Sequence, residues 1–239
     1  MKAFKFNLSG KFAHFKKPDV NQDVYFTYSH IHKVALLGIF GAIMGLEGYH
    51  KDIKDYPDFY KKLKYLNVAI IPKKPYFNKK IQAFNNSVGY ASGEQGGNLI
   101  VKEQWLENPS WDIVVEDDGS EEYNELKRRI DLMEFVYNPY LGKNEHFANI
   151  SDFEEIELKK ATKPLKCISL VPKDKVQMVS IGNRRDIKFY YEEYLPVGLK
   201  EKFLIYEYEK MIFSSWIVES EEMWEISGYG IEFIEKGIE

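Results

Sequence analysis

Cationic and aromatic side chains alternate near the amino terminus, between Ser9 and Pro18. Four cations and two phenylalanines share this short segment: Lys11, Phe12, His14, Phe15, Lys16 and Lys17. Single-stranded nucleic acid is bound by such a combination, because bases stack on aromatic rings while phosphates attract cations. A strand with buried phenylalanines and solvated lysines would show the same pattern. The segment is therefore a candidate nucleic-acid surface with a purely structural alternative.

Three further polar side chains, His30, His32 and Lys33, precede an apolar segment from Val34 to Leu46 that we expect to be a helix. Free N–H groups and the positive end of the helix dipole favour an anion such as phosphate at a helix start. We expect the phosphates of an RNA backbone to bind at this helix start. The alternative is that these residues only make polar contacts that begin the helix.

A metal site is not expected, because no Cys, Asp or Glu accompanies the histidines at a familiar ligand spacing. Metal-independent RNA cleavage needs a base for the 2′-hydroxyl proton and an acid or cation for the leaving oxygen, work that suits His, Tyr and Lys. The chain offers five such side chains: Tyr28, His32, Lys33, Lys143 and His146. This hypothesis requires the five side chains to converge in the fold. The glycines between residues 89 and 97 form neither a phosphate loop nor a dinucleotide fingerprint, and no cofactor is expected.

The arginines occur as two pairs, Arg128-Arg129 in an expected helix and Arg184-Arg185 in an expected loop. Adjacent helix residues point about 100° apart, so they cannot share one ligand easily. The loop pair is therefore the better nucleic-acid candidate, with a solvated turn as its alternative.

Composition limits how such a surface could work. The chain has 239 residues with 33 Lys and Arg against 37 Asp and Glu, a net charge of −4. A free-standing nucleic-acid binder is usually basic, so any RNA contact must be local. The single cysteine, Cys167, excludes an internal disulfide and fits a reducing cytoplasm. The amino terminus lacks the apolar run of a signal peptide, and the 13 residues from Val34 to Leu46 are too few to span a bilayer.

Hydrophobic periodicity predicts an α+β protein. We expect a strand at residues 1–8, a buried strand at 63–71, a pair of strands at 99–106 and 111–116, and an amphipathic helix capped by Asp118. Four glycines at spacings of 3, 4 and 3 predict a smooth face on the first helix, pressed onto the sheet: Gly38, Gly41, Gly45 and Gly48. The order strand, helix, strand, strand, helix, strand is that of the ferredoxin-like fold, an antiparallel sheet with helices on one face.

The pattern changes after residue 148, where short strand-like runs follow without a helical period: Phe153–Leu158, Cys167–Pro172, Lys188–Tyr194, Phe203–Phe213 and Ile231–Ile234. We therefore predict two domains, residues 1–148 and a smaller β-rich domain at 149–239. Residues 76–98, which mix aromatics, lysines and glycines, are expected to protrude as a loop or hairpin.

With these residues in view, the chain resembles the CRISPR-associated Cas-five family of the RAMP superfamily, and most of all its type I-B members. The resemblance spans nearly the whole chain. It rests on four segments in this order: LSGKFAHFKKP at 8–18, TYSHIHKVALLGIFGAIMGLEGY at 27–49, NPYLGKNEH at 138–146 and LPVGL at 195–199.

The resemblance implies a ferredoxin-like first domain with a thumb-like hairpin at 76–98, and a β-rich second domain. It implies a non-catalytic subunit of the Cascade surveillance complex, which caps the 5′ handle of the CRISPR RNA. The implied partners are this RNA, the first backbone subunit, the large subunit and, through the assembled complex, target DNA. Residue types and resemblance together give the following RNA-binding candidates: Lys11, His14, Lys16, Lys17, Tyr28, His30, His32, Lys33, Tyr76, Lys79, Lys80, Tyr90, Arg184 and Arg185.

Two alternatives stay open. Type I-C relatives cleave repeat RNA with a Tyr, Lys and His set, and this chain has Lys143 and His146 near its YLG motif, separated by Asn144-Glu145. A metal-independent endoribonuclease is therefore the second hypothesis. A stand-alone RNA-binding module outside any CRISPR system is the third.

Overall fold

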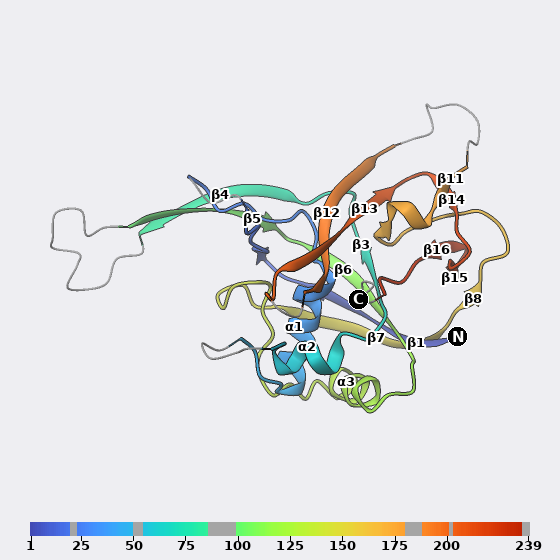
Figure 1. Cartoon of the computed structure of the whole chain (residues 1–239), viewed down its shortest axis with the longest axis horizontal. Coiled ribbons are helices and arrows are strands. Elements are labelled where there is room, and N and C mark those ends of the chain that lie inside the picture. Colours follow the sequence, from blue (N-terminus) through green and yellow to red (C-terminus); the bar gives the residue numbers. More distant parts are fainter. Residues whose placement is uncertain (20–22, 50–54, 86–98, 180–187, 201–202, 236–239) are drawn as a thin grey trace.

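The structure is a computed structural model that describes residues 1–19, 23–49, 55–85, 99–179, 188–200 and 203–235. Figure 1 shows the chain. The helices of this part are α1 (Lys33–Met44), α2 (Asp58–Leu63) and α3 (Glu121–Leu132). Its strands in the first half are β1 (Lys2–Ser9), β2 (Phe12–Ala13), β3 (Val68–Pro72), β4 (Asn78–Asn85), β5 (Ile100–Glu107) and β6 (Ser110–Glu116). Those of the second half are β7 (Asn149–Glu157), β8 (Lys159–Lys160), β9 (Leu165–Lys166), β10 (Val171–Pro172), β11 (Gln177–Met178), β12 (Tyr190–Leu199), β13 (Tyr206–Ser214), β14 (Ile217–Glu219), β15 (Trp224–Ile226) and β16 (Tyr229–Ile231).

A four-stranded antiparallel sheet in the order β3-β6-β1-β7 is the centre of the molecule. Side chains alternate between its faces, as the period of a strand requires. Phe4 and Phe6 of β1 pack on the helices, where the Phe6 ring lies 6.2 Å from Phe40 of α1 and the Phe4 ring 5.3 Å from Tyr123 of α3. The opposite face carries Ala3 and packs on residues of the carboxy-terminal region. The expected α+β protein with mainly antiparallel strands is confirmed.

The glycine face of α1 does not press onto the sheet as expected. A Cβ on Gly41 would lie 2.5 Å from Cβ of Phe59, so Gly41 packs against α2. Gly45 is the left-handed residue that ends the helix, with φ of 76°, and Gly48 lies beyond it. The prediction was wrong about the partner because glycine spacing shows a close approach without showing which element approaches.

The expected pair of strands around the turn at 107–110 is also wrong. β5 pairs with β4 and β2, whereas β6 pairs with β1 and β3. The turn residue Asn108, with φ of 47°, lies where the chain passes from one sheet to the other. Because β6 has a partner on both edges, no edge is left for β5.

The hairpin of β4 and β5 extends away from the four-stranded sheet (Figure 1), in antiparallel register from Asn78↔Glu107 to Asn85↔Ile100. It begins within the segment expected to protrude at 76–98. Residues 86–98 of that segment lie outside the described residues.

Helix α3 begins two residues later than expected. Its N-cap is Ser120, whose hydroxyl accepts a bond of 3.1 Å from the Tyr123 N–H, while Asp118 accepts bonds from Ser120. Tyr123, Leu126 and Ile130 are buried as the periodicity predicts, but Met133 is the left-handed residue that ends the helix.

The carboxy-terminal region is β-rich, with small antiparallel sheets in the orders β10-β13-β12, β11-β14-β9 and β16-β15-β8. The expected strand at Phe153–Leu158 corresponds to β7, which pairs with β1 in the four-stranded sheet. The predicted boundary after residue 148 thus precedes the last strand of that sheet. Among the described residues, no helix is long and apolar enough to cross a membrane.

Candidate nucleic-acid interface

The three-stranded sheet β2-β5-β4 carries three aromatic rings and one lysine of the candidate site, all of them half-buried. Directly opposed residues of antiparallel strands share one face, which places Lys80 of β4 beside Trp105 of β5. Ring contacts connect six side chains into what we call the lysine–aromatic surface: Lys11, Phe12, Lys80, Phe84, Trp105 and Lys143.

Lysine ammonium groups of this surface lie over aromatic rings. Lys80 Nζ is 4.3 Å from the centre of the Phe12 ring and 5.5 Å from that of Trp105. Lys143 Nζ is 4.7 Å from the centre of Phe84. Such cation–π contacts orient the ammonium groups without neutralising them. A neighbouring pair repeats the arrangement, with Lys16 Nζ 3.8 Å from the ring centre of Tyr25.

A buried carboxylate fixes one side of the surface. Glu103 accepts bonds of 3.0 and 2.8 Å from Lys143 and one of 2.8 Å from the Trp105 indole N–H. Burial by itself raises the pKa of Glu103, but the bonds from Lys143 and Trp105 outweigh it and hold the pKa below its ordinary value. The positive charge of Lys143 is therefore compensated by the Glu103 carboxylate. Lys11, Lys16 and Lys80 make no ion pair within the described part of the chain, and their charges can meet phosphate.

Two of the expected histidines lie beneath this surface rather than on it. His14 is buried, with Nδ1 2.9 Å from the carbonyl oxygen of Gln104. His146 is also buried, with its ring centre 4.6 Å from that of Trp105. Burial lowers the pKa of both, which favours the neutral form. In this structure His14 is a packing residue, and its contact with RNA stays a prediction.

The helix entrance is buried too. His32 is the N-cap of α1, since its Nδ1 accepts a bond of 3.2 Å from the Ala35 N–H. His30 lies in the core, where its Nδ1 accepts a bond of 3.3 Å from Trp111 Nε1–H. Burial lowers the pKa of His30 to about 4 and that of His32 to about 3, so neither carries a charge at neutral pH. The structural alternative, polar contacts that begin the helix, describes His32.

Lys33 and Tyr28 also form hydrogen bonds with groups of the chain itself. Lys33 Nζ donates a bond of 3.0 Å to the carbonyl oxygen of Ile234, and burial lowers its pKa to about 7. The Tyr28 hydroxyl donates a bond of 3.1 Å to the Tyr208 hydroxyl. All four side chains at the start of α1 are thus buried in this structure, and the expected phosphate site there stays a prediction.

The remaining candidates differ in their surroundings. Lys17 forms an ion pair with Glu193, and Lys79 Nζ donates a bond of 2.8 Å to Ser29 Oγ. Tyr76 is largely exposed. The candidates Tyr90, Arg184 and Arg185 lie outside the described residues.

The five catalytic candidates divide into two groups. Tyr28, His32 and Lys33 lie at the start of α1, whereas Lys143 and His146 lie by Trp105. No hydrogen bond joins the groups in the described ranges. Within the same ranges, no cluster of three or more His, Cys, Asp or Glu could hold a metal ion.

Residue types alone did not single out Glu103, Trp105, Phe84 or Tyr25. Their importance depends on the register that places Lys80 opposite Trp105, and on the bridge that joins Tyr25 to Glu103. The alternation of Val101, Glu103 and Trp105 was the available signal, but it does not reveal which strand lies opposite.

No protein-family model and no curated protein matches the chain. Solved structures do match. A chain of a "CRISPR RNA-guided surveillance complex" has a TM-score of 0.50 and 13% identity, over 91% of this chain and 91% of that chain. The chain shares its fold with CRISPR-associated proteins.

Two other structures agree. A CRISPR protein from Archaeoglobus fulgidus has a TM-score of 0.53 and 12% identity, over 99% of this chain and 100% of that chain. A chain of the type III-B Cmr-beta complex bound to cognate target RNA and AMPPnP has a TM-score of 0.51 and 10% identity, over 91% of this chain and 86% of that chain. At these identities the likeness establishes the fold and leaves the function to be argued from the site.

Proposed function

We propose that the chain is a Cas-five subunit of type I-B, which caps the 5′ handle of CRISPR RNA in a cytoplasmic Cascade surveillance complex and does not cut it. Its partners are the handle, a backbone subunit, the large subunit and, through the complex, target DNA. The lysine–aromatic surface is the observation that carries the proposal. It supplies rings for bases and cations for phosphates in a fold shared with a surveillance-complex chain.

The strand order supports a ferredoxin-like first domain. Along the chain, β1, α1, β3, β6, α3 and β7 follow the order strand, helix, strand, strand, helix, strand, and the sheet order is β3-β6-β1-β7. In this proposal the β4–β5 hairpin is the thumb. Because β7 belongs to the sheet, we place the start of the β-rich second domain after β7, and no longer at residue 149.

The charge distribution fits a subunit more than a free-standing binder. The net charge is −4, yet Lys11, Lys16 and Lys80 have no carboxylate partner among the described residues. Three such cations suit a few phosphates of a short handle, whereas a long RNA held by electrostatics would need a wider basic face.

One observation favours the ribonuclease alternative. Both ring nitrogens of His146, and Nε2 of His14, are buried without a hydrogen-bond partner in the described part of the chain, and Lys143 lies nearby. A general acid and base need access to the RNA, however, and both histidines are buried and favoured in the neutral form. Capping therefore stays our proposal.

The test is binding and cleavage of labelled repeat RNA by the purified chain and by the complex reconstituted with the proteins encoded beside it, in EDTA. The triple variant Lys11→Ala, Lys16→Ala, Lys80→Ala should bind at least tenfold more weakly. The slope of log affinity against log salt should also become shallower by about 2, at about 0.7 per lost phosphate contact.

A triple variant with the same change of charge, Lys61→Ala, Lys62→Ala, Lys127→Ala, is the control, because these lysines already pair with carboxylates. Equal losses in both triple variants would contradict the proposed surface. Specific cleavage in EDTA that disappears in Lys143→Ala or His146→Ala would establish the ribonuclease instead. If the purified chain alone bound the RNA as tightly as the reconstituted complex does, a stand-alone RNA-binding module would be favoured.

A further inference from the structure

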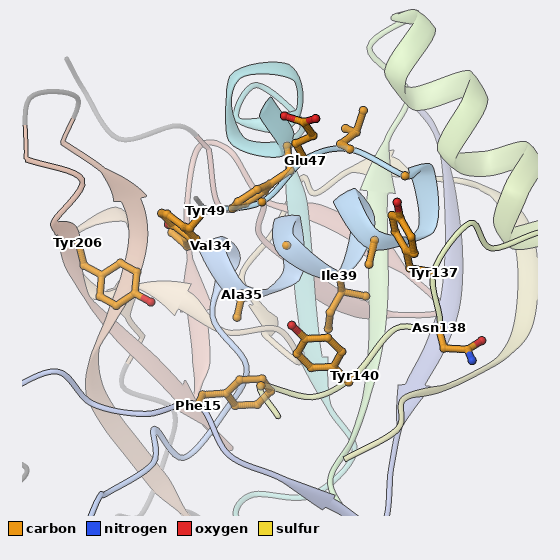
Figure 2. A pocket seen from close by; sticks show the side chains of 17 residues that line it. Phe15, Val34, Ala35, Ile39, Glu47, Tyr49, Tyr137, Asn138, Tyr140 and Tyr206 are labelled. Atoms are coloured by element: carbon orange, nitrogen blue, oxygen red, sulfur yellow. The ribbon is translucent and has the colours of Figure 1, made fainter. Parts of the chain in front are cut away.

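An apolar groove follows the exposed side of α1. Its volume is about 1130 Å³. Figure 2 shows aromatic rings around the helix, among them Tyr49, Tyr137, Tyr140 and Tyr206. The floor between them is made by small residues of α1 and its end, Ala35, Gly38, Ala42 and Gly45.

Several aromatic side chains that form the walls of the groove are unusually exposed. The exposed fractions are 57% for Tyr49, 61% for Tyr137 and 42% for Tyr140. Further apolar side chains at the end of α3 and along the following segment are exposed: Leu132, Met133, Val136 and Phe147. An exposed apolar groove bordered by such side chains marks a contact with another macromolecule.

The wall is fixed to the helix rather than loosely attached. The N–H groups of Val136 and Tyr137 donate bonds of 3.1 Å to the carbonyl oxygens of Ile43 and Ala42. A Cβ on Gly45 would lie 2.8 Å from Val136, so the two segments are in close contact. The groove is therefore formed before a partner arrives, which reduces the entropic cost of docking.

Charge decides between RNA and protein as the occupant. Among the residues that line the groove, Glu47 is charged and none is Lys, Arg or His. Glu47 makes no ion pair in the described part of the chain. Among the described lining residues, a phosphate backbone would meet this carboxylate and no cation, whereas a protein segment with aliphatic side chains and one Lys or Arg would complement both features. Tyrosine is also enriched at the cores of protein interfaces.

We propose that this groove docks an apolar segment of a protein subunit of the same ribonucleoprotein, with a lysine or arginine of that segment facing Glu47. This inference deepens the proposed function and rests on it for the identity of the partner. RNA and protein would then bind at two different sites, RNA at the β4–β5 hairpin and protein along α1.

The first test uses the purified full chain and a displayed library of random 15-residue peptides. Enriched peptides should be apolar with at least one Lys or Arg. Tyr137→Ser should weaken their binding about tenfold, as truncation of an interface aromatic does. Glu47→Lys should weaken it about fivefold, and exchanging the peptide's basic residue for Glu should restore it. Tyr229→Ser, at a tyrosine that is 45% exposed on β16, is the control and should have no effect.

Peptides without apolar or basic preference, or binding unaffected by both groove variants, would overturn the inference. A second arm places a photo-cross-linking amino acid at position 137 in the complex reconstituted with labelled RNA and the proteins encoded beside it. A cross-link to a protein subunit supports the inference, and a cross-link to RNA overturns it. The two proposals fail in different measurements. If the proposed function is wrong, the chain binds no repeat RNA, and the peptide selection still tests the groove.

Discussion

His32 is a side chain that could act in catalysis or binding, but in this structure it stabilises the fold. Its Nδ1 caps α1, and its ring makes edge contacts with Tyr28 and Tyr206 at 5.2 and 5.4 Å between centres. Burial favours the neutral imidazole, and the neutral form is the one that can accept the capping bond. The residue therefore stabilises the start of the helix only while it is unprotonated.

This dependence on protonation gives a pH prediction. The pKa of His32 falls from 6.5 to about 3 on folding, so the unfolded chain binds the proton more readily below pH 6.5. The stabilisation is present above pH 6.5 and is lost as pH falls toward 3. Between pH 7 and 5 the loss from this residue should be about 2 kcal/mol. We expect His32→Asn, which keeps a capping oxygen, to show a smaller fall in the free energy of unfolding over this interval.

The measurement is urea denaturation of both proteins at pH 7 and pH 5. The substitution also removes the ring contacts of His32, so the variant will be less stable at both pH values, and the informative quantity is the difference between the two. His30 still titrates in both proteins and supplies a common background. An identical fall in the wild type and the variant would contradict the burial of a neutral His32.

At the scale of elements, α1 and α2 approach so closely that single glycines control their packing. Gly38 and Gly41 lie on the same face, yet their surroundings differ. A Cβ on Gly41 would lie 2.5 Å from Cβ of Phe59, which cannot swing away. A Cβ on Gly38 would lie 4.0 Å from the edge of the same ring, an ordinary contact.

The two glycines therefore give opposite predictions. Gly41→Ala should lower the free energy of unfolding by about 1–3 kcal/mol, because overpacking forces the helices apart. Gly38→Ala should raise it by up to about 1 kcal/mol, because alanine is the better helix former. Thermal and urea denaturation of the two variants check this pair. Similar effects at both positions would mean that α2 does not pack on α1 as described.

At the scale of the whole molecule, one hydrophobic cluster joins the four-stranded sheet, α1 and the carboxy-terminal region. Residues of β12 and β13 belong to it together with β1 and α1: Leu195, Val197, Leu199, Met211 and Phe213. The bond from Lys33 to the Ile234 carbonyl adds a polar link between the helix and the end of the described chain. The two proposed domains thus share a core instead of meeting at a polar interface.

We therefore expect the isolated chain to unfold in one cooperative transition. Calorimetry should give equal calorimetric and van't Hoff enthalpies, the criterion for a two-state transition. Intrinsic fluorescence and far-ultraviolet circular dichroism should report the same midpoint. Two separated transitions would contradict a shared core and would support independently folding domains.

Sequence periodicity was sufficient for the type and approximate position of many elements. The apolar run before Leu46, the alternation of Phe4 and Phe6, and the turn near Asn108 all correspond to observed features. Each depends on residues close together in the chain, where helix and strand periods are expressed directly. In the basic, aromatic segment, Phe12 contacts Lys80 of β4, and the use of this segment in RNA binding stays a prediction.

What the sequence alone determined was therefore local: an α+β chain, an apolar first helix and a basic, aromatic segment. The tertiary structure decided which strand pairs with β5, that α2 packs on Gly41, and that His30, His32 and Lys33 are buried. These outcomes depend on contacts between segments far apart in the chain. The same residue types can bind phosphate or pack a helix start, and burial decides which, because only side chains reached by solvent can meet an RNA strand.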